Sequence, residues 1–170
     1  KMLLSLSPKE SVGWVSIRGP IMSSDGGKLW ERGAEQWAKR IEQLAATKGV
    51  KAIVLDINSP GGSVGAVQEI YSRILRVKKD KKIPFVALFG DVAASGGYYV
   101  SASAGRIFVS PMTITGSIGV IYTPPSVEGL LAKLKITTDG SGVGTMAGSG
   151  SFARPLNPEQ RDKTVREIMA

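Results

Sequence analysis

Two stretches of the sequence each join an apolar run, a glycine-rich turn and a helix-like segment. "KAIVLDIN" (51–58) and "IPFVALFG" (83–90) have the length and composition of strands covered on both faces. The turns at their ends are "NSPGGSV" (58–64) and "GDVAASGGYY" (90–99). Strands that alternate with helices pair in parallel through right-handed crossovers. The repeat therefore predicts an α/β fold of strand-turn-helix units with a mostly parallel sheet.

Further segments complete the predicted order of elements. One helix carries Trp30 and Trp37 on its apolar face, where core packing is expected. The last helix starts with an Asn157 cap and Pro158. We expect one domain over 1–170, with a flexible Gly/Ser/Thr-rich loop at 138–151. Strands are predicted at 12–19, 106–110 and 115–122, and helices at 28–48, 64–79, 93–104, 126–134 and from 158 onward.

Composition excludes several kinds of chemistry. The chain has no cysteine and no histidine, so thiol nucleophiles, Cys/His zinc sites and a Ser-His-Asp relay are ruled out. We expect neither a metal nor a cofactor. The net charge of +8 is scattered, and its one dense cluster, "RVKKDKK" (76–82), ends a predicted helix, where the dipole favours cations. Nucleic acid is therefore not an expected partner.

The two glycine-rich turns end neighbouring parallel strands, so they meet at one edge of the predicted sheet. Ligands bind at this carboxyl edge in open α/β sheets, and helix starts there offer free N–H groups to a developing negative charge. The second turn also supplies Ser95 at a predicted helix start. Ser95 can be a helix-start residue and the glycines mere turn formers, but the two turns in order favour an oxyanion hole beside a nucleophile.

The stretches "DINSPGGSV", "GDVAASGGYYVSASAGRIF" and "TGSIGVI" resemble the signal peptide peptidase A family, S49-type serine peptidases with the Clp protease/crotonase-like fold. The likeness runs from "VSIRGPI" to "FARPLNPEQR". It implies a Ser-Lys dyad that cleaves peptides, such as remnant signal peptides, through an acyl-enzyme. Matched to the family's motifs, Ser95 is the nucleophile, the N–H groups of Gly62 and Gly96 form the oxyanion hole, and Ser117 orients the lysine.

The family's base lysine is expected about fifty residues after the nucleophile, before the "GSFARPL" stretch, and Ala147 stands there. Four interpretations follow. A lysine-to-alanine replacement, which we favour, makes this chain a disabled protease. The chain can instead be a naturally inactive relative. Lys133 or Lys135 can serve as the base, although both fit solvated surface charges. A partner domain or neighbouring subunit can also supply the lysine.

The resemblance also implies partners and a location. It indicates a homo-oligomer at the cell membrane, with the peptidase domain extracytoplasmic and a membrane anchor outside this chain. The chain opens at Lys1, and no run approaches the roughly 20 apolar residues that cross a bilayer. A peptide substrate is expected to add as a strand beside a mainly apolar S1 pocket. Its expected binding residues are Gly61, Ser63, Gly119 and Val120.

Two rival functions remain. A crotonase-type acyl-CoA enzyme uses the same kind of oxyanion hole but has no need of a nucleophile at Ser95. A non-catalytic peptide-binding scaffold keeps the fold without the dyad, and Ala147 is the residue that favours this rival.

Overall fold

The computed structural model describes residues 9–23 and 33–169, and the chain divides into two compact units, 1–119 and 120–170. Each unit is described by itself below. One domain over 1–170 and a flexible loop at 138–151 stay predictions. Trp30 and the first residues of the helix predicted at 28–48 lie outside the described residues.

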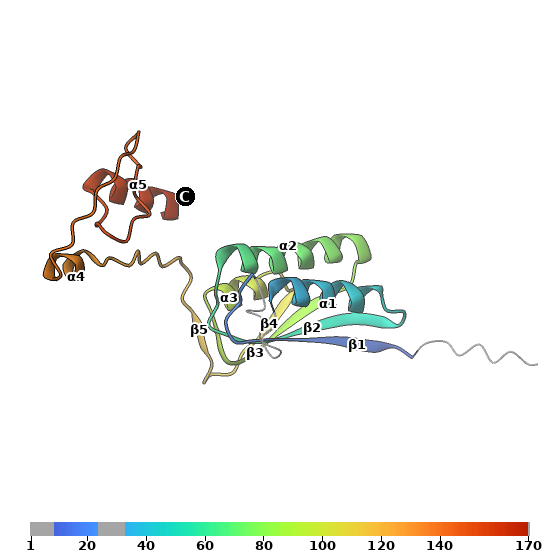
Figure 1. Cartoon of the computed structure of the whole chain (residues 1–170). Coiled ribbons are helices and arrows are strands. Elements are labelled where there is room, and N and C mark those ends of the chain that lie inside the picture. Colours follow the sequence, from blue (N-terminus) through green and yellow to red (C-terminus); the bar gives the residue numbers. More distant parts are fainter. Residues whose placement is uncertain (1–8, 24–32, 170) are drawn as a thin grey trace, which may run out of the picture. The chain divides into compact units, whose positions relative to one another are not determined.

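A parallel sheet is the framework of the first unit (Figure 1). Its strands run in the order β1-β2-β3-β4, and β5 pairs with the last residues of β3. Every pair is parallel, so the carboxyl ends of the strands meet at one edge, as predicted. The strands are β1 (Ser11–Arg18), β2 (Val50–Ser59), β3 (Phe85–Ala94), β4 (Arg106–Phe108) and β5 (Ile114–Gly116).

Helices α1 (Ala34–Ala46), α2 (Val64–Lys81) and α3 (Gly96–Ser101) lie together on one face of this sheet (Figure 1). Alternate side chains of the strands point to these helices and form the core with them. Trp37 is buried in this core, as predicted. Fully buried members of the core include Ile17, Ile41, Ile53, Leu55, Ile57, Ile70, Ile74 and Phe85.

On the other face of the sheet, β2 carries a charged residue that the sequence pattern did not predict. The Asp56 side chain is only 9% exposed, and its carboxylate accepts hydrogen bonds from Arg18 (2.7 Å) and from the Ser16 hydroxyl (2.9 Å). Within this unit no described helix covers this face, where Ala52 and Val54 are partly exposed, so the prediction of a strand covered on both faces is corrected. Neighbouring side chains shield Asp56 instead, because Ser16 and Arg18 come from the paired strand β1.

Two predicted boundaries are wrong. The helix predicted at 93–104 is only Gly96–Ser101, since β3 continues to Ala94 by pairing with β5. The strand predicted at 115–122 is confined to Ile114–Gly116. Both errors have one cause: small and apolar residues here take their structure from pairing between β3 and β5, not from local periodicity.

One ion-pair cluster joins α1 to α2. Glu42 of α1 accepts hydrogen bonds from Arg73 and Arg76 of α2. The Arg73 hydrogen bond, followed by that of Arg76, holds the pKa of the Glu42 carboxyl below its usual range. A glutamate whose pKa is lowered by folding stabilises the fold above its unfolded pKa and loses that contribution as the pH falls through the folded value.

Glu42→Gln is therefore expected to lower the free energy of unfolding slightly near neutral pH, by less than about 1 kcal/mol because the cluster is partly exposed. The difference from the parent chain should shrink below about pH 4.3, where glutamate normally protonates. Urea unfolding of both chains across this pH range checks the prediction. A deficit that is constant with pH would contradict an ionic origin.

The second unit is held together by contacts between its loops and its last helix. It contains α4 (Glu128–Lys133) and α5 (Pro158–Met169). The predicted Asn157 cap is confirmed: its side-chain oxygen accepts the Gln160 N–H (2.8 Å), and the Gln160 side chain accepts the Asn157 N–H (3.2 Å). This reciprocal pair is a capping box.

Candidate active site

Ser95 is the junction between β3 and α3. Its backbone has φ 50° and ψ −120°, a left-handed conformation that is uncommon and costly for a residue with a Cβ atom. The Ser95 N–H donates to the Gly116 carbonyl of β5 (2.9 Å), and this hydrogen bond ties the turn at Ser95 to strand β5. The half-buried Ser95 hydroxyl makes no capping hydrogen bond to α3. Ser95 therefore occupies the N-cap position of α3 through its backbone, whose carbonyl accepts the Tyr99 N–H (2.9 Å), while its hydroxyl stands at the carboxyl edge of the sheet and does not cap the helix.

The first glycine-rich turn packs directly against this junction. A Cβ atom on Gly61 would lie 2.6 Å from the Gly96 nitrogen and 2.9 Å from the Ser95 Cβ. A Cβ atom on Gly96 would lie 3.3 Å from the Gly62 nitrogen. The structure therefore brings together Ser95 and both predicted oxyanion donors. Only residues without a Cβ atom allow this approach.

Gly62 is held by a residue that the sequence analysis missed. Ile21 forms a parallel bridge with it: the Ile21 N–H donates to the Gly61 carbonyl (2.9 Å), and the Ser63 N–H donates to the Ile21 carbonyl (2.8 Å). Backbone groups alternate in direction along an extended segment, so the Gly62 N–H faces away from Ile21. Among the described residues no acceptor engages the Gly62 N–H, which leaves it free for a developing oxyanion.

Other main-chain groups of the first turn are already engaged. The Gly61 N–H donates to the buried Ser59 hydroxyl (3.1 Å), and the Ser63 carbonyl accepts the Val67 N–H (3.0 Å). Gly61 and Ser63 thus both use their N–H and carbonyl groups inside the fold, and their part in peptide binding stays a prediction. The Ser63 side chain remains half-buried beside Gly62.

A third segment reaches the site through β5. Ser117 directly follows Gly116, whose carbonyl accepts the Ser95 N–H, so Ser117 is brought beside the turn that carries Ser95. It is exposed and also has a positive φ of 50°. Gly119 is exposed, while Val120 belongs to the second unit.

Side chains from the strand ends brace the two turns. Asn58 accepts the Val92 N–H (3.1 Å), which links the end of β2 to β3. The Thr115 hydroxyl donates to the Ala93 carbonyl (2.7 Å) beside Ser95. Asn58 opens the first turn motif, but Thr115 lies outside both turns, and neither motif reveals which backbone groups these side chains bind.

Ala147 lies in the second unit, within a turn that two side chains stabilise. Its carbonyl accepts hydrogen bonds from Arg154 (2.8 Å) and from Gln160 (3.2 Å). Gln160 is 5% exposed and also binds the Thr145 carbonyl (3.0 Å). The capped start of α5 therefore determines the backbone path through position 147.

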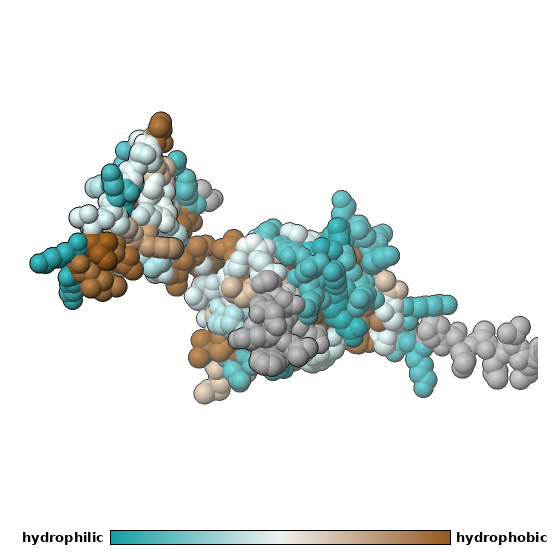
Figure 2. Space-filling model, viewed as in Figure 1, coloured by the Kyte–Doolittle hydropathy of each residue, from teal (hydrophilic) through white to brown (hydrophobic). Residues whose placement is uncertain are grey.

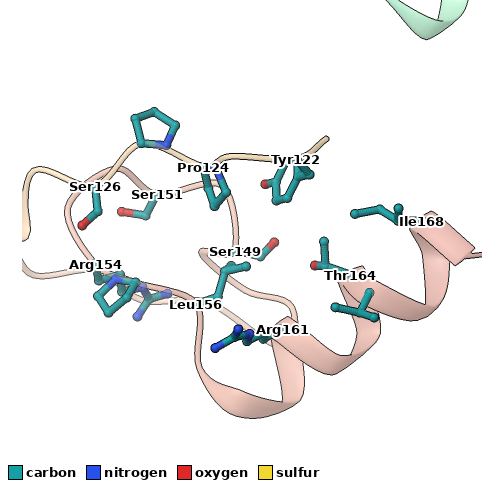
Figure 3. Close-up of a pocket in the computed structure, with 13 residues that line it drawn as sticks. Tyr122, Pro124, Ser126, Ser149, Ser151, Arg154, Leu156, Arg161, Thr164 and Ile168 are labelled. Atoms are coloured by element: carbon teal, nitrogen blue, oxygen red, sulfur yellow. The ribbon is translucent and has the colours of Figure 1, made fainter. Parts of the chain in front are cut away.

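The second unit also contains a pocket of about 420 Å³ (Figure 3). Its lining combines Arg154 and Arg161 with apolar side chains and with hydroxyl groups (Figure 3). The aliphatic hydroxyl groups belong to Ser126, Ser149, Ser151 and Thr164. None of the residues predicted for the active site lines this pocket.

Two kinds of feature are absent from the described residues. Within 9–23 and 33–169, no group of three or more acidic side chains could hold a metal ion. In the same ranges, no helix is both long and apolar enough to span a membrane.

Comparison with known families gives two matches. The model described as "Peptidase family S49" matches residues 77–169, and the Clp protease model matches residues 24–114. The first range contains Ser95 and Ala147, and the second contains both glycine-rich turns. The Clp protease-like α/β fold agrees with the parallel sheet described above.

Individual relatives are similar over most of this chain. A protein of Enterococcus faecium named for the signal peptide peptidase SppA is 36% identical over 91% of the chain, and Protease 4 of Salmonella typhi is 39% identical over 90%. The chain spans 45% and 25% of the lengths of these two relatives. A lysine-to-alanine mutant of the 1510-N membrane-bound stomatin-specific protease, solved with a substrate peptide, is 26% identical over 67% of this chain and 48% of its own, with a TM-score of 0.53.

Proposed function

Because the chain belongs to peptidase family S49, we propose that Ser95 is the nucleophile of a serine endopeptidase that acts through an acyl-enzyme. The observation that carries this proposal is the contact between the two glycine-rich turns. Gly61 and Gly62 pack against Ser95 and Gly96, which unites a free hydroxyl with two backbone donors.

Each group then has a chemical role. The Ser95 Oγ attacks the scissile carbonyl carbon, and a neutral lysine accepts the hydroxyl proton. The N–H groups of Gly62 and Gly96 stabilise the oxyanion, a contribution of about 3 kcal/mol per donor on the usual scale. The lysine returns the proton to the leaving amine, and water then hydrolyses the Ser95 ester. Ser117 orients the lysine in this scheme.

The base must come from outside the described part of the first unit. Lys39 is paired with Glu35 on the surface of α1. The other described lysines of this unit lie at the amino ends of the strands or at the far ends of α1 and α2, and α2 alone is about 27 Å long. They are Lys9, Lys48, Lys51, Lys78, Lys79, Lys81 and Lys82.

With alanine at position 147, we propose that this chain alone does not cleave peptides. The lysine-to-alanine mutant of the stomatin-specific protease was solved with a substrate peptide, which supports the idea that loss of the base leaves peptide binding intact. The second candidate function, a non-catalytic peptide-binding protein, is favoured by Ala147 alone. Both candidates place a peptide beside Ser95.

The wider function is proposed from the family. We propose that the intact protein cleaves remnant signal peptides as a homo-oligomer, on the extracytoplasmic side of a membrane, with an anchor outside this chain. The relatives' greater length supports further segments in the intact protein.

The test is hydrolysis of an apolar fluorogenic peptide by the parent chain and by Ala147→Lys. The parent chain is expected to be inactive and Ala147→Lys active, because position 147 then supplies the base. Activity should rise with pH as the lysine loses its proton. Ser95→Ala in the Ala147→Lys chain is the control and should abolish hydrolysis.

Other outcomes separate the alternatives. Ser95-dependent hydrolysis by the parent chain would show that another lysine serves, and Lys133→Ala and Lys135→Ala would then test the two nearest in sequence. A folded Ala147→Lys chain that binds peptide without cleaving it would favour the scaffold.

A further inference from the structure

The sheet has a second edge, opposite Ser95, where the amino ends of the strands meet. Pairing of Ser11 with Val50 and of Ile53 with Phe85 brings the starts of β1, β2 and β3 together. The end of α2 lies at the same edge, since the Lys78 ammonium donates to the Ser103 carbonyl just before β4 (2.6 Å). Segments far apart in the sequence therefore form one surface.

This surface, which we call the basic edge, carries most of the chain's excess positive charge. Eight cationic side chains lie there against the carboxylates of Glu10 and Asp80. Lys51 is paired with Glu10 at 3.5 Å, and no other cation of the edge has a carboxylate partner among the described residues. Figure 2 shows hydrophilic side chains where β1 begins and α2 ends. The cations are Lys9, Lys48, Lys51, Lys78, Lys79, Lys81, Lys82 and Arg106.

Helix stabilisation explains only part of the basic edge. Cations in the last turn of α2 interact favourably with its dipole, and the Lys78 ammonium has a carbonyl partner. Lys9, Lys51 and Arg106 belong to no helix end, and Lys79, Lys81 and Lys82 are exposed. Gathering this many like charges opposes folding unless a partner neutralises them.

We propose that the basic edge docks on an anionic membrane surface. Clusters of four to eight cations attract acidic lipid headgroups, at about 1 kcal/mol for each lysine near the surface. Lysine dominates the edge, whereas arginine is the usual choice for nucleic acid. Only Arg106 among these cations has an aromatic residue two positions away, the exposed Phe108, so the edge lacks the row of aromatic side chains on which successive bases stack.

Docking in this way also orients the active site. β2 crosses the sheet from the basic edge to Ser59, a span of about 30 Å for its 10 residues. Ser95 would then face away from the headgroups, toward peptides in the aqueous phase. This inference concerns a surface remote from Ser95 and stands whether or not the chain is a peptidase.

The test is sedimentation with vesicles of phosphatidylglycerol and phosphatidylcholine in a one-to-two ratio. The parent chain is expected to bind them, to bind pure phosphatidylcholine vesicles far less, and to dissociate as salt is added. Lys79→Gln, Lys81→Gln and Lys82→Gln together should weaken binding about a hundredfold, at about fivefold per lysine.

The matched control removes three lysines from the second unit by Lys133→Gln, Lys135→Gln and Lys163→Gln. Its net charge equals that of the first triple variant, so it should retain most of the binding if position matters. Equal losses in both triple variants, or equal binding to pure phosphatidylcholine, would overturn the proposal. The proposal would also fail if duplex DNA displaced the protein from the vesicles at a concentration lower than that of the lipid. That result would identify the edge as a nucleic-acid surface.

Discussion

Gly62→Ala is expected to lower the free energy of unfolding of the first unit by about 3 kcal/mol. This is near the upper end of the usual cost of forcing an extra methyl group into a packed site. The new Cβ atom would lie 2.0 Å from the Ile21 carbonyl oxygen and 2.7 Å from the Ile21 nitrogen. These are backbone atoms, which cannot rotate away as the tip of a side chain can. The bridge between Ile21 and Gly62 must open, and its two flanking hydrogen bonds are lost with it.

Gly65→Ala provides the matched control for this prediction. Gly65 lies in the first turn of α2 and has no atom within 4 Å of its would-be Cβ, so alanine should stabilise the helix by about 0.5–1 kcal/mol. Urea unfolding followed by circular dichroism measures both variants. Equal stability of the two variants would mean that Ile21 does not hold Gly62 in solution.

Ser95→Gly is expected to raise the free energy of unfolding by about 1 kcal/mol. A residue with a Cβ atom pays about 1–3 kcal/mol for a backbone such as φ 50°, ψ −120°, and glycine escapes this cost. Glycine also has more conformational freedom in the unfolded chain, which lowers the stability of the folded state and cancels about 0.5–1 kcal/mol of that gain. The predicted nucleophile therefore occupies its position at the expense of stability.

Ser95→Ala separates backbone strain from loss of the hydroxyl. Alanine keeps the Cβ atom and hence the strain, so its stability should stay within about 0.5 kcal/mol of the parent. Thermal and urea unfolding of the three chains checks this order. A Ser95→Gly chain no more stable than Ser95→Ala would show that the junction is relaxed.

Functional consequences of the glycine-rich turns could be predicted before the structure was known, but their contacts could not. The motifs at 58–64 and 90–99 point to two N–H donors and a serine at one edge. Nothing in either motif reveals that Ile21 holds Gly62, since that bridge joins segments about forty residues apart. The engaged main chain of Ser63 likewise follows from this bridge.

The basic edge illustrates the same limit in electrostatics. The cluster at 76–82 is visible in the sequence and has a sufficient local explanation as a helix end. Lys9, Lys48 and Lys51 look like isolated charges until strand pairing sets them beside it. Charge density is a property of a surface, so it depends on neighbours in space.

By itself, the sequence determined the order of elements, the parallel sheet, the Asn157 cap and the place of Ser95 near the start of a helix. These follow from local periodicity, turn residues and caps, which report what each short segment buries or leaves open. Only the tertiary structure decided that β3 extends to Ala94, that Ser95 takes a positive φ, and that Gly61 approaches Gly96 closely. Strand register and close backbone packing set these features, and both arise between segments that no local pattern connects.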